Sequence, residues 1–342
     1  MKIIPFLSLA LFLFIACKSN QKILAIPSGS NEFKVAFGSC NKHDKINPLW
    51  DDVLAAKPDV WVWGGDIVYA DTEDMDVLSD MYNAQNLVPG YKKLRESIPV
   101  IGTWDDHDYG LNDGGMEFRA KKESQQELLN FLGIDKDNIR RTQEGVYASH
   151  EYLLPAGKVK IIVLDTRYFR TSLTPDTQTK KRNKPNIYGE GTILGNTQWE
   201  WLAEELKNSS ADFNLIMSSI QFLSNKHGFE CWGNFPHEVD KLNRTIATSN
   251  AEGVIILSGD RHISEFSKTN VEGLPYPLID FTSSGLTHVY SDFSGEENPY
   301  RKGKVVFEKS FGLIKIDLNT KTVIFTIRGD NGVILGELQQ SY

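Results

Sequence analysis

The sequence lacks the basic excess that nucleic-acid binding requires. Its 342 residues contain 37 Lys and Arg against 45 Asp and Glu, which gives a net charge of −8 and a pI of about 5.5. A protein that binds nucleic acid needs a basic surface to neutralise phosphates, so no nucleic-acid partner is expected. A small anionic substrate stays compatible with the net negative charge if cationic side chains near the site offset its repulsion.

Three common catalytic signatures are also missing. The sequence contains no G-x-S-x-G turn, no H-E-x-x-H helix and no Walker A loop. It has no internal repeat, no low-complexity block and no clear interdomain linker. With 40% hydrophobic and 24% charged residues it has the composition of a soluble globular protein, and one large domain is the simplest account of its length.

Cysteine is scarce, with 3 residues in the whole chain. Cys17 lies in the N-terminal segment, which leaves Cys40 and Cys231. In an oxidising compartment a disulfide between these two is the simplest expectation. The alternative is that Cys40 is a metal ligand, because of the motif in which it lies.

The first 16 residues are predicted to be the signal peptide of a bacterial lipoprotein. Lys2 precedes the apolar run 3–15, which is shorter than the roughly 20 residues that span a bilayer. Ala16-Cys17 is typical of a lipobox, in which Cys17 is lipidated, whereas plain secretion is the alternative. We therefore expect a periplasmic or surface-exposed protein of the cell envelope, anchored through Cys17, with residues 17–32 as a connector.

Short apolar runs followed by tight polar turns recur along the chain. The runs 60–63 and 98–101 are predicted to be buried strands, and they lead into Gly65-Asp66 and Asp105-Asp106-His107. Loops at the carboxyl ends of parallel strands converge on one crevice in an open α/β sheet. Asp66 and His107 are therefore expected to lie at one place.

Two further turns belong to the same pattern. The run 33–37 leads into Gly38-Ser39-Cys40, and a helix over 47–56 connects it to the next strand, which makes a βαβ unit. The run 254–257 leads into Gly259-Asp260-Arg261-His262. The remaining predicted elements are helices over 74–97 (with a break at Pro89-Gly90), 116–132, 197–206 and 237–248, strands over 146–153, 159–164 and 213–217, antiparallel hairpins over 305–308, 311–317 and 323–328 with a turn at Asn331-Gly332, and a long polar loop over 170–191.

The side chains in these turns have the donor types of a metal site. One Gly-Asp turn means little, because Asp is common in turns, but three such loops at the same end of the strands are unlikely by accident. Tyr69 as a core aromatic and Asn112 as a turn former stay open as alternatives. The candidates are Cys40, Asp66, Tyr69, Asp106, His107, Asn112, Gln221, Asp260 and His262.

These motifs, in this order, resemble those of the PhoD-like (alkaline phosphatase D) branch of the calcineurin-like metallophosphatases. The segments that carry the resemblance are Gly38-Ser39-Cys40, Gly65-Asp66-Ile67-Val68-Tyr69, Trp104-Asp105-Asp106-His107-Asp108 and Ser258-Gly259-Asp260-Arg261-His262. Trp-Asp-Asp-His is the most specific of them. The resemblance covers residues 33–342 as one metallophosphatase domain, and it implies an α/β sandwich of two mixed β-sheets flanked by helices.

The resemblance also implies a dinuclear site with trivalent iron and calcium, with zinc as the fallback for the first metal. The thiolate of Cys40 and the phenolate of Tyr69 suit iron, His262 completes that side, and Asp66 would bridge the two metals. The oxygen donors of the second site suit calcium, and Gln221 stands where related phosphatases have a histidine. The calcium ligands implied are Asp106, Asn112 and Asp260.

The implied activity is hydrolysis of a small phosphate monoester by metal-activated water in a monomeric enzyme. His107 would donate a proton to the leaving group, with Asp66 or Asp108 orienting it. A phosphodiesterase or phospholipase-type activity, or a non-enzymatic surface binding lipoprotein, are the alternatives. His227, His237 and His288 are expected to be surface or packing residues, Arg167 an ion-pair residue, and Arg261 a phosphate contact.

Overall fold

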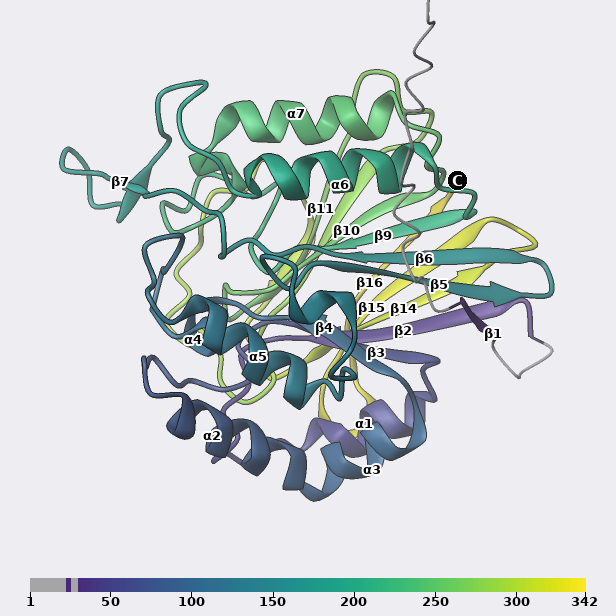
Figure 1. Ribbon diagram of the computed structural model, residues 1–342. Helices are drawn as coiled ribbons and strands as arrows, with labels where there is room; N and C mark the ends of the chain where they lie inside the picture. Colours follow the sequence, from purple (N-terminus) through teal and green to yellow (C-terminus); the bar gives the residue numbers. More distant parts are fainter. Residues whose placement is uncertain (1–22, 26–29) are drawn as a thin grey trace, which may run out of the picture.

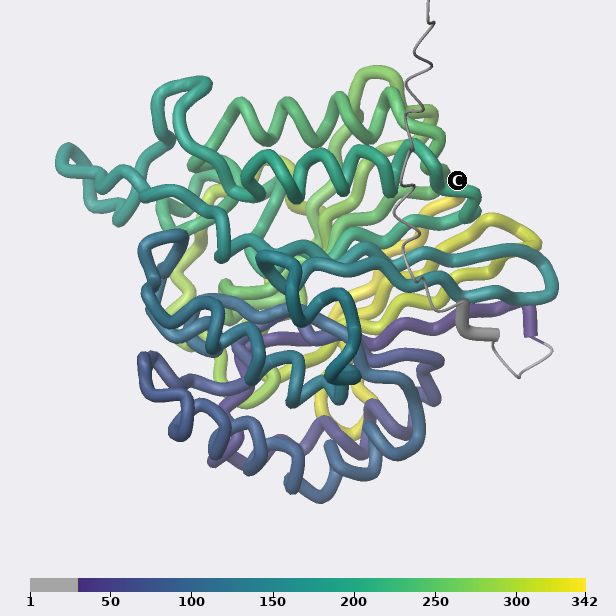
Figure 2. Tube along the Cα trace, in the orientation of Figure 1, coloured from purple at the N-terminus to yellow at the C-terminus, as the bar shows by residue number. Residues whose placement is uncertain are grey.

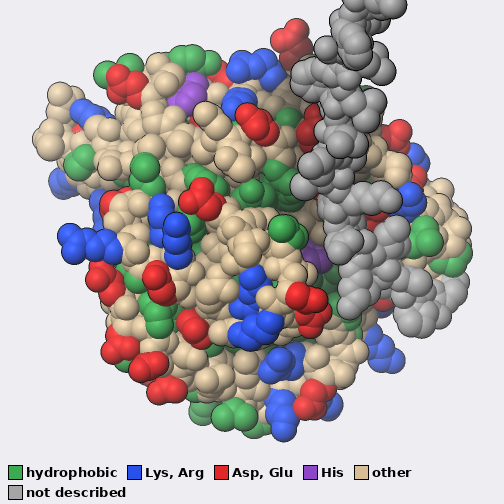
Figure 3. Space-filling view, in the orientation of Figure 1, with side chains coloured by type: hydrophobic (Ala, Val, Ile, Leu, Met, Phe, Trp, Pro, Cys, Tyr) green, Lys and Arg blue, Asp and Glu red, His purple; other side chains and the backbone are tan. Residues whose placement is uncertain are grey.

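The structure, a computed structural model, describes residues 23–25 and 30–342, and two β-sheets packed face to face form its centre (Figure 1). The predicted signal peptide and Cys17 lie outside the described residues. Within the described part, no helix is both long enough and apolar enough to cross a membrane. On the face shown in Figure 3, basic and acidic side chains are interspersed.

The six-stranded sheet holds the first βαβ unit. Its parallel strands β2, β3 and β4 are joined at the other side of β2 by an antiparallel meander from the end of the chain. Figure 2 shows the C-terminal strands lying beside the N-terminal ones. The strands in spatial order are β16 (Ile334–Ser341), β15 (Thr322–Arg328), β14 (Phe311–Asp317), β2 (Glu32–Gly38), β3 (Val60–Gly64) and β4 (Val100–Thr103).

The eight-stranded sheet is mixed: its four middle strands run parallel, the next strand on each side pairs with them antiparallel, and the edge strand β1 pairs with β5 in parallel. Strands β6, β9, β10 and β12 run parallel, so their carboxyl ends share one edge. The strands in spatial order are β1 (Ile23–Ala25), β5 (Ala148–Leu154), β6 (Gly157–Val163), β9 (Phe213–Met217), β10 (Val254–Ser258), β12 (Leu278–Ser283), β11 (Ser264–Thr269) and β13 (Arg301–Val306).

The main core lies between the two sheets. Alternate residues of the strands point inward, and β-branched and aromatic side chains fill the space, as period-2 patterns predict. Phe37 of one sheet meets Phe281 of the other edge to face, with ring centroids 4.9 Å apart. Because the side chains of the two sheets interdigitate in this apolar core, the strand ends on both sheets are held in fixed positions.

Helices cover the outer face of each sheet. Trp50 and Leu94 pack helices onto the six-stranded sheet, and Trp199 and Leu242 do so on the eight-stranded sheet. Pro89 at the start of α3 ends the preceding helix, as predicted. The covering helices are α1 (Leu49–Ala56), α2 (Met75–Leu87), α3 (Pro89–Ser97) and α5 (Lys121–Phe131) on one side, and α6 (Gly195–Lys207) and α7 (Pro236–Ala247) on the other (Figure 1).

Shorter elements occupy the connections. The polar loop over 170–191 projects from the body and contains the two-residue strands β7 (Thr174–Pro175) and β8 (Asn183–Lys184) (Figure 2). The other short elements are α4 (Asp106–Tyr109), η1 (Ile139–Arg141), η2 (Trp232–Asn234) and η3 (Asp330–Gly332).

The predicted sandwich of two mixed sheets is confirmed, but three local predictions were wrong. The helix expected over 116–132 begins at Lys121. Strands β11 and β12 were missed, and the run over 305–308 ends β13 of the eight-stranded sheet rather than joining the C-terminal hairpins. Strand β11 carries polar residues on both faces, and its Glu265 is buried against Asn298 and Arg301, so no apolar alternation marked it.

Candidate metal centre

Loops from both sheets converge at the carboxyl ends of their parallel strands. Gly65 and Gly259 permit the close approach of these loops. A Cβ on Gly65 would lie 2.4 Å from Cβ of Asp105, and a Cβ on Gly259 would lie 2.5 Å from Oγ of Ser39. The glycines of the Gly-Asp turns are therefore required by packing between the loops as well as by the turns themselves.

Four different donor types meet around Asp66. Its Oδ2 lies 3.4 Å from Sγ of Cys40 and 3.1 Å from the hydroxyl of Tyr69. The Tyr69 hydroxyl lies 3.5 Å from Nε2 of His262. A thiol, a carboxylate, a phenol and an imidazole from three loops thus surround one point, as the sequence pattern predicts.

Carboxylates form a second group that shares Asp66 with the first. Each of three sets of side chains has its donor atoms within 4.8 Å of one another, the separation expected around a single ion. Asp66 and Asp106 each belong to two sets. The sets are Cys40, Asp66 and His262; Asp66, Asp106 and His107; and Asp105, Asp106 and Asp260.

Several of these residues have a left-handed backbone, which is unfavourable for side chains with a Cβ. The φ angles are 57° at Cys40, 51° at Asp66, 66° at Asp260 and 55° at His262. Each such conformation costs about 1 kcal/mol or more and persists where the surrounding structure enforces it. Four of them in one donor group indicate that the loops are shaped to aim these side chains.

The buried acids disfavour one another's negative charge. Burial, with Cys40 and Asp106 nearby, raises the pKa of Asp66 well above its usual range. Burial likewise raises the pKa of Asp260 to about 7 and that of the Cys40 thiol to about 11. Oδ2 of Asp105 is buried and has no hydrogen-bond partner among the described residues. Cations fit this group, because they would stabilise the charged forms and satisfy the free oxygen.

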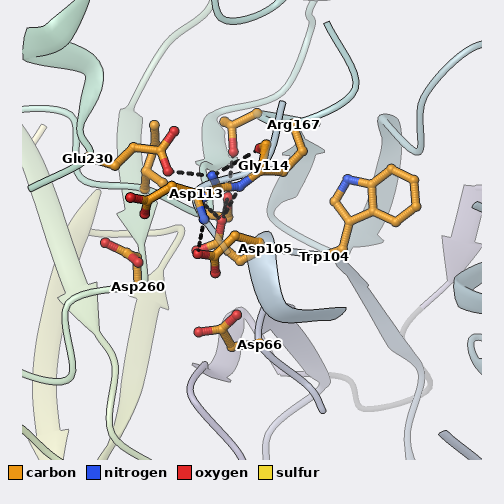
Figure 4. A network of polar contacts seen from close by, with 12 residues as sticks. Asp66, Trp104, Asp105, Asp113, Gly114, Arg167, Glu230 and Asp260 are labelled. Carbon is orange, nitrogen blue, oxygen red and sulfur yellow. Dashed lines mark hydrogen bonds and ion pairs between the residues drawn. The ribbon is translucent and has the colours of Figure 1, made fainter. Parts of the chain in front are cut away.

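Arg167 is a cation built into the same region, as expected for an ion-pair residue. Its guanidinium is fully buried and bonds Asp105, with Nε 2.6 Å from Oδ1, and it also pairs with Glu230 (Figure 4). Burial disfavours the charge of Asp106, but Arg167 and His107 outweigh burial and lower its pKa. Arg167 therefore offsets part of the negative charge.

We expect Arg167→Met to lower the free energy of unfolding by about 3–5 kcal/mol, because it leaves the buried carboxylate of Asp105 without its cation, while Glu230 keeps Arg170. The matched control is Arg182→Met, since Arg182 pairs with Asp113 at 2.8 Å and its side chain is 55% exposed. An exposed pair contributes about 1 kcal/mol or less. Urea unfolding of both metal-free variants measures the difference, and equal losses would contradict it.

His107 is held by a residue that the sequence analysis missed. Its Nδ1 lies 2.8 Å from Oδ2 of Asp71, which fixes the ring, and its side chain is partly exposed. Burial opposes a charge on this ring, but the bond to Asp71 and the nearby Asp106 raise its pKa. Asp71 follows Tyr69 by two residues, and its left-handed φ of 44° turns it toward His107.

The expectation that Asp66 or Asp108 orients the His107 ring was therefore wrong. Asp108 instead joins two loops through their backbone. Its Oδ1 accepts from the backbone N–H of Asp105 at 2.7 Å and of Asp66 at 3.0 Å. A carboxylate that satisfies otherwise unpaired backbone donors is structural, and it holds the two acidic turns in register.

Three other candidates are not members of these donor sets, and two of them have other partners. Asn112 is exposed, and its role as a ligand stays a prediction. Gln221 is buried, with Nε2 donating to Glu265 at 3.0 Å and Thr282 at 2.9 Å. Arg261, expected to contact phosphate, pairs with Glu296 at 2.8 Å. The Cys40–Cys231 disulfide does not form, since both cysteines are free and buried.

His288, expected to be a packing or surface residue, lies at the centre. Its ring centroid is 4.5 Å from that of His262 and 4.9 Å from that of Tyr69. Burial, with His262 and Lys42 nearby, lowers its pKa to about 3. The sequence does contain a signal, because His288 follows strand β12 and Gly285 in the same strand-and-turn pattern as the other loops.

A surface cavity beside α7 does not coincide with the donor group. It has a volume of about 530 Å³ and is lined by residues of α7 and β11, among them Val239, Asn243 and Thr269. It contains none of the predicted ligands. The candidate site is therefore identified by the convergence of donor atoms and not by this cavity.

Sequence comparison connects this geometry to a family. The profile of the PhoD-like phosphatases matches residues 35–322, which include all the loops described above. The chain belongs to the PhoD-like phosphatase family. Among curated proteins, alkaline phosphatase D of Bacillus subtilis (strain 168) is 23% identical over 200 residues. The match covers 53% of this chain but only 34% of that protein.

Solved structures show the same fold. The structure of PhoD superposes with a TM-score of 0.68 at 16% identity and covers 91% of this chain and 68% of that chain. A dimetal phosphatase from Danio rerio has a TM-score of 0.53 at 13% identity, covering 91% and 99%. GAP50, the anchor in the inner membrane complex of Plasmodium, has a TM-score of 0.59 at 11% identity, covering 91% and 89%. PhoD-like phosphatases thus share this architecture with a protein described as an anchor.

Proposed function

We propose that this protein is a metal-dependent phosphate monoester hydrolase with a dinuclear centre. The observation that carries the proposal is the cluster of donors around Asp66, with a thiol, a phenol and an imidazole on one side and buried carboxylates on the other. Membership of the PhoD-like phosphatases supports the same reaction class.

The donor types divide into two sites. Cys40, Tyr69 and His262, with Asp66, would hold trivalent iron, for which anionic sulfur and phenolate oxygen are suitable ligands. Asp106 and Asp260, with Asp66 shared, would hold calcium, which prefers oxygen ligands. Bound there, the cations would supply charge stabilisation for a phosphoryl group and a water of lowered pKa.

The protein side chains would complete the reaction. His107 would give a proton to the departing alkoxide, and its raised pKa keeps the ring protonated at higher pH than a free histidine. Asp71 would hold the ring in place through Nδ1, which leaves Nε2 to face the leaving group. His107 is partly exposed, so a leaving group can reach it from solvent.

Metal analysis of the purified chain from residue 18 onward tests the proposal. We expect iron and calcium by mass spectrometry, a visible charge-transfer band, and faster hydrolysis of p-nitrophenyl phosphate than of its bis-ester. Cys40→Ser should lose the sulfur contribution to the band and most of the iron. Cys231→Ser is the matched control, since it removes the other free, buried thiol and should leave both unchanged.

Two other results would revise the proposal. Zinc without colour would retain a hydrolase but contradict iron at Cys40 and Tyr69. No bound metal and no hydrolysis, after growth with iron and calcium supplied, would favour a surface binding protein instead.

A further inference from the structure

Lys42 lies beside the metal centre and has no carboxylate partner within residues 30–342. Its Nζ is 4.8 Å from the centroid of the Tyr69 ring. The adjoining backbone is anchored, because the Asn41 N–H donates to the carbonyl of Asp66 at 2.8 Å and the Lys42 N–H donates to Oγ1 of Thr287 at 2.8 Å. The anchored main chain therefore holds the Lys42 ammonium group beside the ring of Tyr69.

His288 presents an unused polar atom at the same place. Its Nδ1 lies 3.1 Å from Oγ1 of Thr287, the residue that also anchors Lys42. Its Nε2 is buried and has no hydrogen-bond partner in the described part of the chain. A buried nitrogen without a partner is costly, which indicates that a ligand completes this position.

The metal centre is lined by acids, so an anionic ligand that binds there needs a cation beside it. Asp66, Asp106 and Asp260 line the centre, and Asp71 lies behind His107. The cation of Arg167 is already committed to Asp105 and Glu230, and that of Arg261 to Glu296. Lys42 is free of such a pair, so its charge is available to an anionic ligand.

We propose that Lys42 and His288 form a subsite, beside Tyr69, for the non-bridging oxygens of a dianionic phosphate monoester. The inference rests on the proposed function, since it assumes that the Asp66 group receives the phosphoryl group. This subsite requires the tautomer with the proton on Nε2, in which the Thr287 hydroxyl turns from the Cys40 carbonyl, 3.4 Å away, to donate to Nδ1 of His288, and Nε2–H donates to one phosphate oxygen. Lys42 swings from the face of Tyr69 to pair with another.

The charge of the substrate makes this subsite selective. A phosphate monoester carries about −1.5 to −2 charge at pH 7 and three free oxygens, whereas a diester has fewer of both. The attraction of Lys42 grows with the charge of its partner. Lys42 should therefore favour monoesters over diesters on the same metals.

The test compares Lys42→Ala with Lys45→Ala, which removes the same charge from an exposed position in the same loop. Calorimetric titration of the metal-loaded proteins with inorganic phosphate should show about tenfold weaker binding for Lys42→Ala, the loss of one charge-assisted hydrogen bond. KM for p-nitrophenyl phosphate should rise by the same factor, with kcat and the bis-ester rate little changed. Lys45→Ala should match the unaltered chain, and Lys42→Arg should recover most of the binding.

His288 is tested in the same way. His288→Ala should weaken phosphate binding with its metal content unchanged, and His288→Gln, which keeps an N–H donor, should restore part of it. Loss of metal in His288→Ala would make His288 a ligand and overturn its assignment to the subsite.

Equal effects of Lys42→Ala and Lys45→Ala, or equal losses for monoester and diester, would overturn the Lys42 assignment. Failure of the proposed function has a different signature, the absence of metal and hydrolysis in the unaltered chain. If that chain also bound no phosphate, the subsite would be overturned with it.

Discussion

Replacing His107 by alanine is expected to lower kcat for p-nitrophenyl phosphate by about 10²–10⁴ while metal content stays unchanged, the range for loss of a general acid. The ring lies 2.8 Å from Asp71 through Nδ1, and its centroid is 4.1 Å from that of Tyr69. The ring is thus fixed beside the centre through Nδ1, while Nε2 has no hydrogen-bond partner among the residues that the structure describes. The measurement pairs steady-state kinetics with metal analysis of the same sample.

The structure also allows a second role for His107, that of a metal ligand, and this experiment distinguishes the two roles. His107 belongs to one of the sets of donors that could surround an ion, together with Asp66 and Asp106. If metal content fell together with kcat, His107 would be a ligand rather than a proton donor. Asp71→Asn is the positioning control, and we expect it to lower kcat less than His107→Ala does. It should also shift the alkaline limb of the pH profile to lower pH, because it removes one cause of the raised pKa of His107.

The part of the site that sequence reasoning could predict is the part encoded by strand-and-turn patterns. Cys40, Asp66 and Asp260 each follow an apolar run closely. The parallel pairing of β2 and β3 brings the first two turns together, and the packing of the two sheets brings the turn after β10 to them. Helix boundaries followed from similar local signals, such as Pro89 at the start of α3. Both kinds of inference depend only on neighbouring residues in the chain.

The rest depends on partners that are distant in sequence. Arg167 meets Asp105 across 62 positions, and nothing near either residue indicates the other. The bond between Asp71 and His107 spans 36 positions and needs the left-handed backbone of Asp71. Strand β11 places one aromatic residue, Phe266, in the core, while its buried Glu265 meets hydrogen-bonding partners, so an alternation rule cannot detect the strand.

Asp66→Asn is expected to remove bound metal and lower activity by more than about 10³, because in the proposed division of ligands this carboxylate alone belongs to both the iron site and the calcium site. In the metal-free protein the same change should not reduce the free energy of unfolding at pH 7. The raised pKa of Asp66 means that its charged form is disfavoured in the folded state, so a neutral amide removes that cost. Metal affinity and apo stability should thus respond differently to one substitution.

The pH dependence of the stability of the metal-free protein provides a second test of this prediction. Acids whose folded pKa is raised stabilise the fold below their unfolded pKa of about 3.9, and this stability is lost as pH rises through the folded value. For Asp260 and Asp108 that value is about 7, so the metal-free protein should lose stability from about pH 4 to 7. Asp66→Asn should reduce this loss, and adding metal should reduce it further in the unaltered chain only, because the share of Asp108, which is not a ligand, remains. Asp280→Asn is the control: Asp280 is also fully buried and its pKa is raised to about 6, but its Oδ2 accepts from the backbone N–H of Phe222 and Leu223 at 2.9 Å and its Oδ1 accepts from Ser258, so an amide N–H₂ would face a donor. The Asp280→Asn protein should lose stability and keep its metal. If Asp66→Asn and Asp280→Asn behaved alike in urea unfolding and metal analysis, Asp66 would be a structural acid rather than a shared ligand.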